Sequence, residues 1–262
     1  MFKKIIVMVV VLLWFSSAFG AHPLITDDAG TQGRKKFQIE VNSEFSYDKE
    51  KKFSEDTGDW VTEKTTGGEI ATNLSYGVDD YTDIVIGLPY QWSEVKENDI
   101  VASDEDGVSD MSMEMKWRFY EKDGLNFALK PGVTLPTGDD ERGLGSGRTT
   151  YSMVFIATKE ISPAAFHLNF GYKRNDNKVD ERRDIWHASF ASDVEVVKNL
   201  EAVANIGVER NHTKTSHTQP AFILGGLIYS VSENLDIDLG VKGGLNNAEA
   251  DYTILAGIAR RF

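Results

Sequence analysis

The chain has 262 residues, no cysteine and a formal net charge of −13, because 41 Asp and Glu residues outnumber 28 Lys and Arg residues. This acidic balance excludes a nucleic-acid-binding protein, since neutralising phosphates requires clustered Lys and Arg. A chain without cysteine also forgoes disulfides, and its length suits one large β domain or two small ones.

The N-terminus has the parts of a secretory signal peptide. Two lysines precede the apolar run 5–15, and small residues lead to a cleavage site after Gly20. The run is shorter than the ~20 residues that a membrane helix requires, and no later segment is apolar for long enough. We therefore expect residues 1–20 to be a cleaved signal peptide and the protein to be periplasmic, secreted or a barrel in a bacterial outer membrane.

Residues 21–36, AHPLITDDAGTQGRKK, come between this signal and the first predicted strand. They form either a bare periplasmic tail or a hatch that tucks into the interior of the fold. The residues themselves do not choose between the two.

From residue 37 onward, apolar and polar residues alternate. In DMSMEMKWRF (110–119), Met, Trp and Phe share one parity and the other parity is polar or charged. Successive side chains of a strand point to opposite faces, and about 9–11 residues of tilted strand span a bilayer. About twelve segments show the pattern: 37–47, 68–76, 83–92, 110–119, 125–135, 149–159, 165–172, 185–196, 200–210, 221–231, 235–245 and 251–262.

The connections between these segments alternate in length. The long polar loops are 48–62, 93–108, 136–148, 174–184 and 211–219, and the short turns are 77–81, 121–124, 160–163, 197–200 and 232–234. Short turns on one side, long loops on the other and an even strand count are typical of bacterial outer-membrane barrels. The sequence therefore predicts an all-β fold over 37–262, a closed antiparallel up-and-down transmembrane β-barrel of about 12 strands.

One hairpin register follows from keeping apolar faces together, because a slip of one residue exchanges the two faces. A three-residue turn at 122–124 aligns Phe119 with Phe127 and Trp117 with Leu129. We predict this turn rather than a two-residue one.

The cost of charge in lipid decides which face is outside. A charged side chain on the lipid face costs about 2–4 kcal/mol at the midplane, so the polar parity is expected to line the lumen and contact solute. These lumen-lining candidates are Glu40, Glu44, Asp110, Glu114, Lys116, Arg118, Lys130, His167, His187, Asp236, Asp238 and Lys242. Aromatic residues near both rims are expected to form the membrane girdles: Tyr90, Trp92, Trp117, Phe119, Tyr172, Trp186, Tyr252 and Phe262.

Four inward residues form a Ser/His/Asn grouping across one predicted hairpin. Folding about the loop 174–183 places His167 opposite Ser189 and Asn169 opposite His187. Outer-membrane phospholipases use Ser, His and Asn on the lipid-facing side, whereas these four residues share the inward parity. We therefore expect polar lumen lining, no catalytic residues and no enzyme.

Metal and cofactor signals are weak. The segments 103–110 and 138–143 concentrate carboxylates in outer loops, where Ca²⁺ takes oxygen ligands, but neither has EF-hand spacing. They are either solvated acidic loops or divalent-ion sites that bridge lipopolysaccharide; we expect the former, with no metal and no cofactor.

Three segments carry a resemblance to known proteins. HPLITDDAGTQGRKKFQIE (22–40) and KPGVTLPTGDDERGLGSGRTTYS (130–152) resemble the outer-membrane proteins of the "MetA-pathway of phenol degradation" family. The last strand ends on Phe262, as in the signal by which the barrel-assembly machinery recognises its clients, although Arg260 departs from that pattern. The resemblance implies a transporter-like outer-membrane barrel, linked by name to the catabolism of aromatic compounds, with no enzyme activity.

We thus expect a passive, porin-like channel or transporter in a Gram-negative outer membrane for small molecules, among them aromatic or hydrophobic compounds. Two alternatives stay open: a structural barrel with a filled lumen and no transport, and a soluble periplasmic β protein. The expected partners are outer-membrane lipid, lipopolysaccharide, the barrel-assembly machinery and a small-molecule solute.

Overall fold

A computed structural model describes residues 22–53 and 59–262, so the signal peptide expected at 1–20 lies outside the described residues. In the described part of the chain, no helix is long and apolar enough to cross a membrane. The structure is built from strands and one helical turn, η1 (Asp140–Arg142). The strands are β1 (Phe37–Phe53), β2 (Trp60–Gly77), β3 (Thr82–Glu97), β4 (Ile100–Val108), β5 (Met111–Lys122), β6 (Leu125–Leu135), β7 (Thr150–Ile161), β8 (Ala164–Arg174), β9 (Asp184–Val197), β10 (Leu200–Glu209), β11 (Ala221–Ser232), β12 (Leu235–Gly244) and β13 (Tyr252–Arg261).

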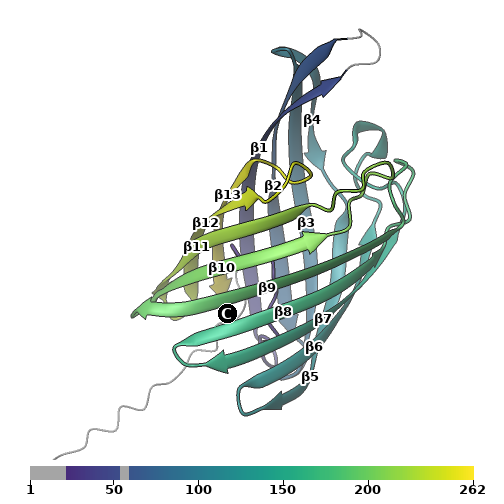
Figure 1. Ribbon diagram of the computed structural model, residues 1–262. Coiled ribbons are helices and arrows are strands. Elements are labelled where there is room, and N and C mark those ends of the chain that lie inside the picture. Colours follow the sequence, from purple (N-terminus) through teal and green to yellow (C-terminus); the bar gives the residue numbers. More distant parts are fainter. Residues whose placement is uncertain (1–21, 54–58) are drawn as a thin grey trace, which may run out of the picture.

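The strands close into a barrel (Figure 1). The sheet has 13 strands, and β4 pairs with β3 alone. The other strands form an antiparallel ring in which β1 pairs with both β2 and β13, and β2 pairs with β3. The predicted closed antiparallel barrel of about 12 strands is confirmed, with β4 as an extra strand outside the ring.

The seam of the barrel lies between the two ends of the ring. The N–H of Phe262 donates to the carbonyl of Phe37 at 2.9 Å, and the N–H of Phe37 donates back at 3.3 Å. Their rings stack with centroids 4.4 Å apart. The terminal aromatic residue of the sequence therefore covers the joint where the first and last strands meet.

The two faces of the strands differ as the alternation predicted. On β12, Leu239 is 59% exposed and Val241 55% exposed on the outside, whereas Asp236 is 5% exposed on the inside. On β5, Met113, Met115, Trp117 and Phe119 are all exposed. Such a continuous apolar outer surface suits hydrocarbon and would be costly in water.

Two of the predicted outer loops are wrong. The segments 48–62 and 93–108 are largely strand: β1 and β2 stay paired as far as Phe53 and Trp60, and β3 turns at 98–99 into β4. In Figure 1 these hairpins stand well above the rest of the barrel. The charged residues of these two segments are typical of loops. A strand outside the membrane can also carry charged side chains, because the hydrogen bonds between strands are formed by the backbone.

The predicted turn at 122–124 is also wrong. Lys122 pairs with Leu125, so the turn has two residues, Asp123 (φ 52°) and Gly124 (φ 70°), which is the positive-φ conformation favoured in tight hairpins. A bulge between Arg118 and Tyr120 then restores the expected pairing of Trp117 with Leu129. The extra residue of the bulge corrects the face mismatch that the two-residue turn creates.

Residues 22–36, here called the N-terminal segment, lie inside the ring. Leu24 packs against Val203, Ile228 and Phe222, and Ala29 packs against Ile156. These partners lie on inward positions of β7, β10 and β11, so part of the interior is an apolar core around this segment.

A charge on the outer face should destabilise the barrel. Leu239 lies in the middle of β12, and we expect Leu239→Arg to lower the free energy of unfolding in lipid vesicles by about 2–4 kcal/mol, since an arginine there meets hydrocarbon. Urea unfolding of the reconstituted protein measures this, with Leu239→Ala as the matched control. An arginine variant as stable as the alanine variant would contradict contact with lipid.

Candidate functional site: the lumen and its N-terminal segment

The N-terminal segment is bonded to the barrel wall. Its backbone N–H groups donate to wall side chains: Ile25 and Thr26 to Asn205 Oδ1 (2.8 and 3.0 Å), Asp27 to Asn169 Oδ1 (2.8 Å) and Ala29 to Thr158 Oγ1 (2.9 Å). The imidazole of His22 bonds Asp238 at 2.6 Å. These partners come from β7, β8, β10 and β12 and satisfy the backbone of a segment that has no secondary structure of its own.

Asp27 is held by two lysines. Lys116 Nζ on β5 lies 2.7 Å from one carboxylate oxygen, and Lys130 Nζ on β6 lies 2.9 Å from the other. Burial alone would raise the pKa of Asp27, but the two ammonium groups outweigh it and hold that pKa below its usual range. Lys130 also pairs with Glu114 at 3.2 Å. Asp27 therefore stays charged and ties the segment to β5 and β6.

The neighbouring Asp28 is in a different environment. It is 1% exposed, and one of its oxygens accepts from the N–H of Gly30. Burial raises the pKa of this carboxyl, and the charge on Lys116 only partly opposes that rise. Two adjacent aspartates thus differ because only Asp27 is ion-paired.

His167 is linked to the N-terminal segment through Thr158. Its Nε2 lies 2.6 Å from Asp193 Oδ2, and its Nδ1 lies 2.9 Å from Thr158 Oγ1, which accepts from Ala29. A Thr–His–Asp chain of this kind is reminiscent of a catalytic relay. All three side chains are buried and line neither of the cavities described below, so the chain positions an acceptor for the N-terminal segment.

The predicted Ser/His/Asn pairing is wrong by two residues. Asn169 lies opposite Ser189, and His187 lies opposite Gly171, where a Cβ would collide with the imidazole ring. Ser189 Oγ accepts from Thr26 at 2.8 Å. Ser189 is therefore bonded to the N-terminal segment, and the turn of this hairpin lies one residue further along the chain than predicted.

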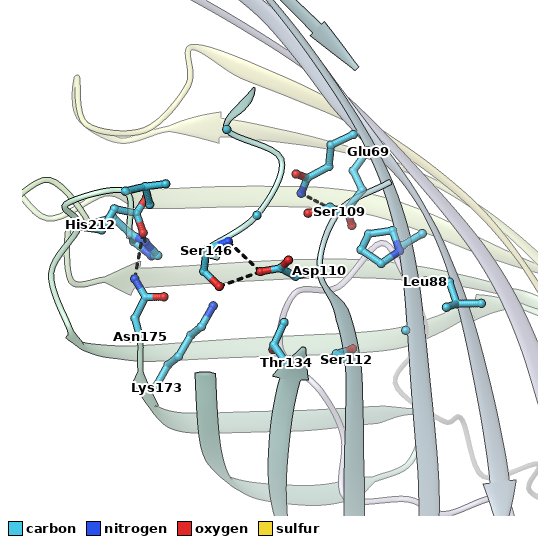
Figure 2. Close-up of a pocket in the computed structure, with 18 of the residues that line it drawn as sticks. Glu69, Leu88, Ser109, Asp110, Ser112, Thr134, Ser146, Lys173, Asn175 and His212 are labelled. Atoms are coloured by element: carbon cyan, nitrogen blue, oxygen red, sulfur yellow. Dashed lines mark hydrogen bonds and ion pairs between the residues drawn. The ribbon is translucent and has the colours of Figure 1, made fainter. Parts of the chain in front are cut away.

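The upper cavity, here called the vestibule, has a volume of about 460 Å³. Figure 2 shows Glu69, Asp110, Lys173 and His212 around it. Asp110 anchors its rim by accepting from the N–H and the hydroxyl of Ser146, both at 2.8 Å. A Cβ on Gly145 would collide with this carboxylate, which explains the middle glycine of the GLGSG motif (143–147).

The second cavity, here called the lower cavity, has a volume of about 220 Å³ and lies between the N-terminal segment and the wall. Asn73 lines both the vestibule and the lower cavity. It pairs with Gly87 on β3, which pairs with Ser112 on β5. Small side chains on three adjacent strands therefore surround the junction of the two cavities.

The segment bonds to both sides of the lumen. The backbone N–H groups of residues 25–29 bond to β7, β8 and β10, whereas the side chain of Asp27 and the N–H of Gln32 reach β5, β6 and β3. The wall residues of the lower cavity come from β1, β2, β3, β5 and β6. A solute that passes the segment would therefore follow the wall of β1–β3 and β5.

The structure places the 12 lumen candidates in different roles. Asp110 lines the vestibule, and Glu40, Glu114, Lys116 and Lys130 line the lower cavity. The others lie elsewhere on the inner face: Glu44 opposite Glu69, Arg118 beside Glu121 (3.2 Å), His167 and His187 as above, Asp236 on Arg261, Asp238 on His22, and Lys242 on Glu249 (2.8 Å). Solute contact by any of them stays a prediction.

Functional neighbours that the sequence pattern missed come from three sources. Asp27 and Asp28 lie in a segment without periodicity. Asn73 and Asp83 have the inward parity but are not among the residues predicted to contact solute. The apolar inward residues Phe222 and Leu224 lie in a strand that is apolar on both faces, so alternation gave no signal for them.

The eight girdle candidates fall into two groups along the barrel. Tyr90, Tyr172, Trp186 and Tyr252 are exposed toward the loop end, and Trp117, Phe119 and Phe262 toward the turn end. Trp92 is less exposed because its indole lies across Gly68. Their position at a membrane interface stays a prediction.

Among the described residues, no cluster of three or more His, Asp and Glu side chains is arranged to hold a metal ion. The acidic loops 103–110 and 138–143 instead bond to other parts of the chain. Glu105 accepts from Arg142 at 2.6 Å, and Asp110 accepts from Ser146.

His212 joins two outer loops. Its ring nitrogens lie 3.2 Å from Glu181 Oε2 and 3.0 Å from Glu209 Oε1. The hydrogen bonds to these carboxylates raise the pKa of His212 to about 9, and the bond from His212 lowers the pKa of Glu181. The charged imidazolium therefore clasps the loop 175–183 to the loop 210–220 beside the vestibule.

The comparison with known proteins gives one family. The sequence profile of the family described as "Putative MetA-pathway of phenol degradation" matches residues 23–262. Among curated proteins, no sequence relative matches the chain.

Solved structures share the fold at low sequence identity. An outer membrane channel (COG4313) from Pseudomonas putida F1 superposes with a TM-score of 0.67 at 13% identity, covering 90% of this chain and 98% of that one. The NanC porin gives 0.53 at 9% identity, covering 85% and 98%. The translocator domain of the autotransporter NalP from Neisseria meningitidis gives 0.51 at 11%, covering 88% and 89%.

Removing the carboxylate of Asp27 should loosen the N-terminal segment. Asp27→Ala leaves Lys116 and Lys130 buried without their shared partner, and breaking a buried pair costs about 3–5 kcal/mol. We expect amide hydrogens of residues 24–31 to exchange with deuterium at least about tenfold faster. The exposed Asp104→Ala is the control, and unchanged exchange in Asp27→Ala would contradict the tether.

The clasp at His212 should depend on pH. Because folding raises the pKa of His212 from 6.5 to about 9, its contribution is full below about pH 6.5 and is lost as the pH rises through about 9. The lowered pKa of Glu181 adds a loss below about pH 4.5. Hydrogen exchange of the loop 210–220 should therefore be slowest near pH 5–6 after correction for the intrinsic rate. His212→Gln should abolish this minimum and His217→Gln should not.

Proposed function

The chain belongs to the MetA-pathway family of phenol degradation, and from this premise we propose that it is a passive channel for small molecules in the outer membrane of a Gram-negative bacterium. The barrel fold fits this role, but it is shared with porins and with a protein translocator and does not select among them. The choice therefore rests on the lumen.

One observation carries the proposal: the vestibule and the lower cavity share Asn73. At about 460 and 220 Å³, each is several times the roughly 30 Å³ that a water molecule occupies. A small organic molecule fits in either. The proposed route therefore runs from the vestibule at the outer loops past Asn73 into the lower cavity beside the N-terminal segment.

The solutes we propose are small molecules, including aromatic compounds such as the family description names. The lumen supports this with a mixed lining, in which the vestibule has both carboxylates and the apolar side chains of Pro89 and Val179. A phenol presents one polar group and one apolar ring, which such a lining accommodates.

The proposed setting follows from the outer surface. Its apolar belt would contact outer-membrane lipid, and its loops would contact lipopolysaccharide. The signal peptide would direct export, and the barrel-assembly machinery would recognise β13 and Phe262. We propose no enzyme activity, because the His167 relay is occupied by the N-terminal segment.

A filled structural barrel is the second candidate. The observation that favours it is the number of bonds that hold the N-terminal segment in the lumen, from His22 to Gln32. In that case the segment would be a permanent plug and the cavities would be closed at the periplasmic end. A soluble periplasmic protein is disfavoured by the exposed apolar belt.

Single-channel recording in planar bilayers separates channel from plug. We expect the wild-type protein to conduct, and Asn73→Trp to lower the conductance several-fold, because the indole would block the junction of the two cavities. Leu74→Trp is the matched control, since Leu74 is the next residue and points outward. A wild-type protein that inserts without conducting would favour the filled barrel. Equal conductance of the two variants would contradict the proposed route.

A further inference from the structure

Three buried oxygen atoms around the lower cavity have no hydrogen-bond partner. They are Asp28 Oδ2, Gln38 Oε1 and Asp83 Oδ1. Their residues are 1%, 5% and 2% exposed and all line this one cavity. Leaving a buried acceptor unsatisfied costs about 1–3 kcal/mol, and more when the group is charged. Three unpartnered acceptors in one place therefore indicate that the cavity receives a donor.

The basic groups around the lower cavity are already paired. Lys116 and Lys130 line it, but their ammonium groups bond Asp27 and Glu114. His22 also lines it, and its ring bonds Asp238.

Three further carboxyl groups line the cavity: Asp28, Glu40 and Asp83. None of them forms an ion pair within 22–53 and 59–262. The wall therefore carries acidic groups that form no ion pair with any described base.

The acceptors converge from different elements. Asp28 comes from the N-terminal segment, Gln38 from β1 and Asp83 from β3. Gln38 pairs with Ser75 on β2, which pairs with Val85 on β3, two residues from Asp83 and on the same face. Asp83 accepts from the N–H of Gln32, four residues along the segment from Asp28. A ligand in this cavity would thus meet oxygens from both the segment and the wall.

We infer that the lower cavity binds small organic cations, with a protonated amine donating to Asp28, Gln38 and Asp83. An ammonium group has three donors and one positive charge, which matches three acceptors and an acidic wall. A divalent metal fits less well, because no group of three carboxylate or imidazole side chains has metal-binding geometry among the described residues. This inference deepens the proposed function by naming a solute class, and it rests on that function only for transport.

Asparagine substitutions can separate ligand binding from the fold. Asp28 accepts from the N–H of Gly30, and Asp83 accepts from the N–H of Gln32 at 2.9 Å, each through the oxygen that has a partner. Asp28→Asn and Asp83→Asn can keep these bonds and replace the unpartnered oxygen by an NH₂ group. Each substitution removes one charge and turns one acceptor into a donor.

The experiment compares three probes that share a phenol ring and differ in charge: tyramine, phenol and 4-hydroxyphenylacetate. Titration calorimetry on the full-length protein in detergent should show tyramine binding at least about tenfold more tightly than the other two. Asp28→Asn and Asp83→Asn should each weaken tyramine binding by about tenfold or more, as expected for a charged hydrogen bond. The exposed Asp104→Asn changes the charge equally and should leave binding unchanged.

The outcomes distinguish this inference from the channel proposal. If tyramine binds no more tightly than phenol or the acid, the inference is wrong, and this comparison needs only the wild-type protein. It is equally wrong if both lumen variants keep a heat-modifiable gel shift and bind tyramine like the wild type. Selective tyramine binding without conductance would support the cation site and reject the channel. Conductance with no preference for tyramine would support the channel and reject the cation site.

Discussion

Backbone hydrogen bonding in a solvent that offers no partners is the constraint from which this structure follows. In hydrocarbon each unsatisfied N–H or C=O costs several kcal/mol, so a spanning sheet has to close on itself. Here β1 pairs with β13 on one side and with β2 on the other, and Phe37 stacks on Phe262 over the seam. Closure removes the free edges of the 12-strand ring, while β4 outside it pairs on one side only. A closed ring necessarily encloses an interior.

The inward polar side chains of the closed ring cannot all pack on one another. Other parts of the chain, or a solute, therefore fill the space between them. The N-terminal segment takes part of it. It brings Leu24 to an apolar patch and Asp27 to two lysines, and it presents its backbone to Asn169 and Asn205. The two cavities occupy space that the segment leaves open, so the position of the segment decides where a proposed solute could go.

That arrangement also explains why the unpaired acidic groups collect on one side. Lys116 and Lys130 turn toward Asp27, which leaves Asp28, Glu40 and Asp83 facing the lower cavity without a base. A tether for the segment and an acidic wall for a ligand therefore arise from the same two lysines. The proposed transport and the proposed binding both depend in this way on the position of a single short segment.

The sequence by itself determined the strand count of the ring, the outward face and the side of the long loops, because a period of two and lipid energetics act locally on each strand. Only the tertiary structure decided the two-residue turn at 123–124, the long hairpins of β1–β4, the register of His187 and the docking of residues 22–36. Those depend on bulges and on contacts between residues as far apart as Asp27 and Asn169, 142 positions along the chain. No periodicity marks such contacts, since side chains distant in sequence meet only when the ring closes.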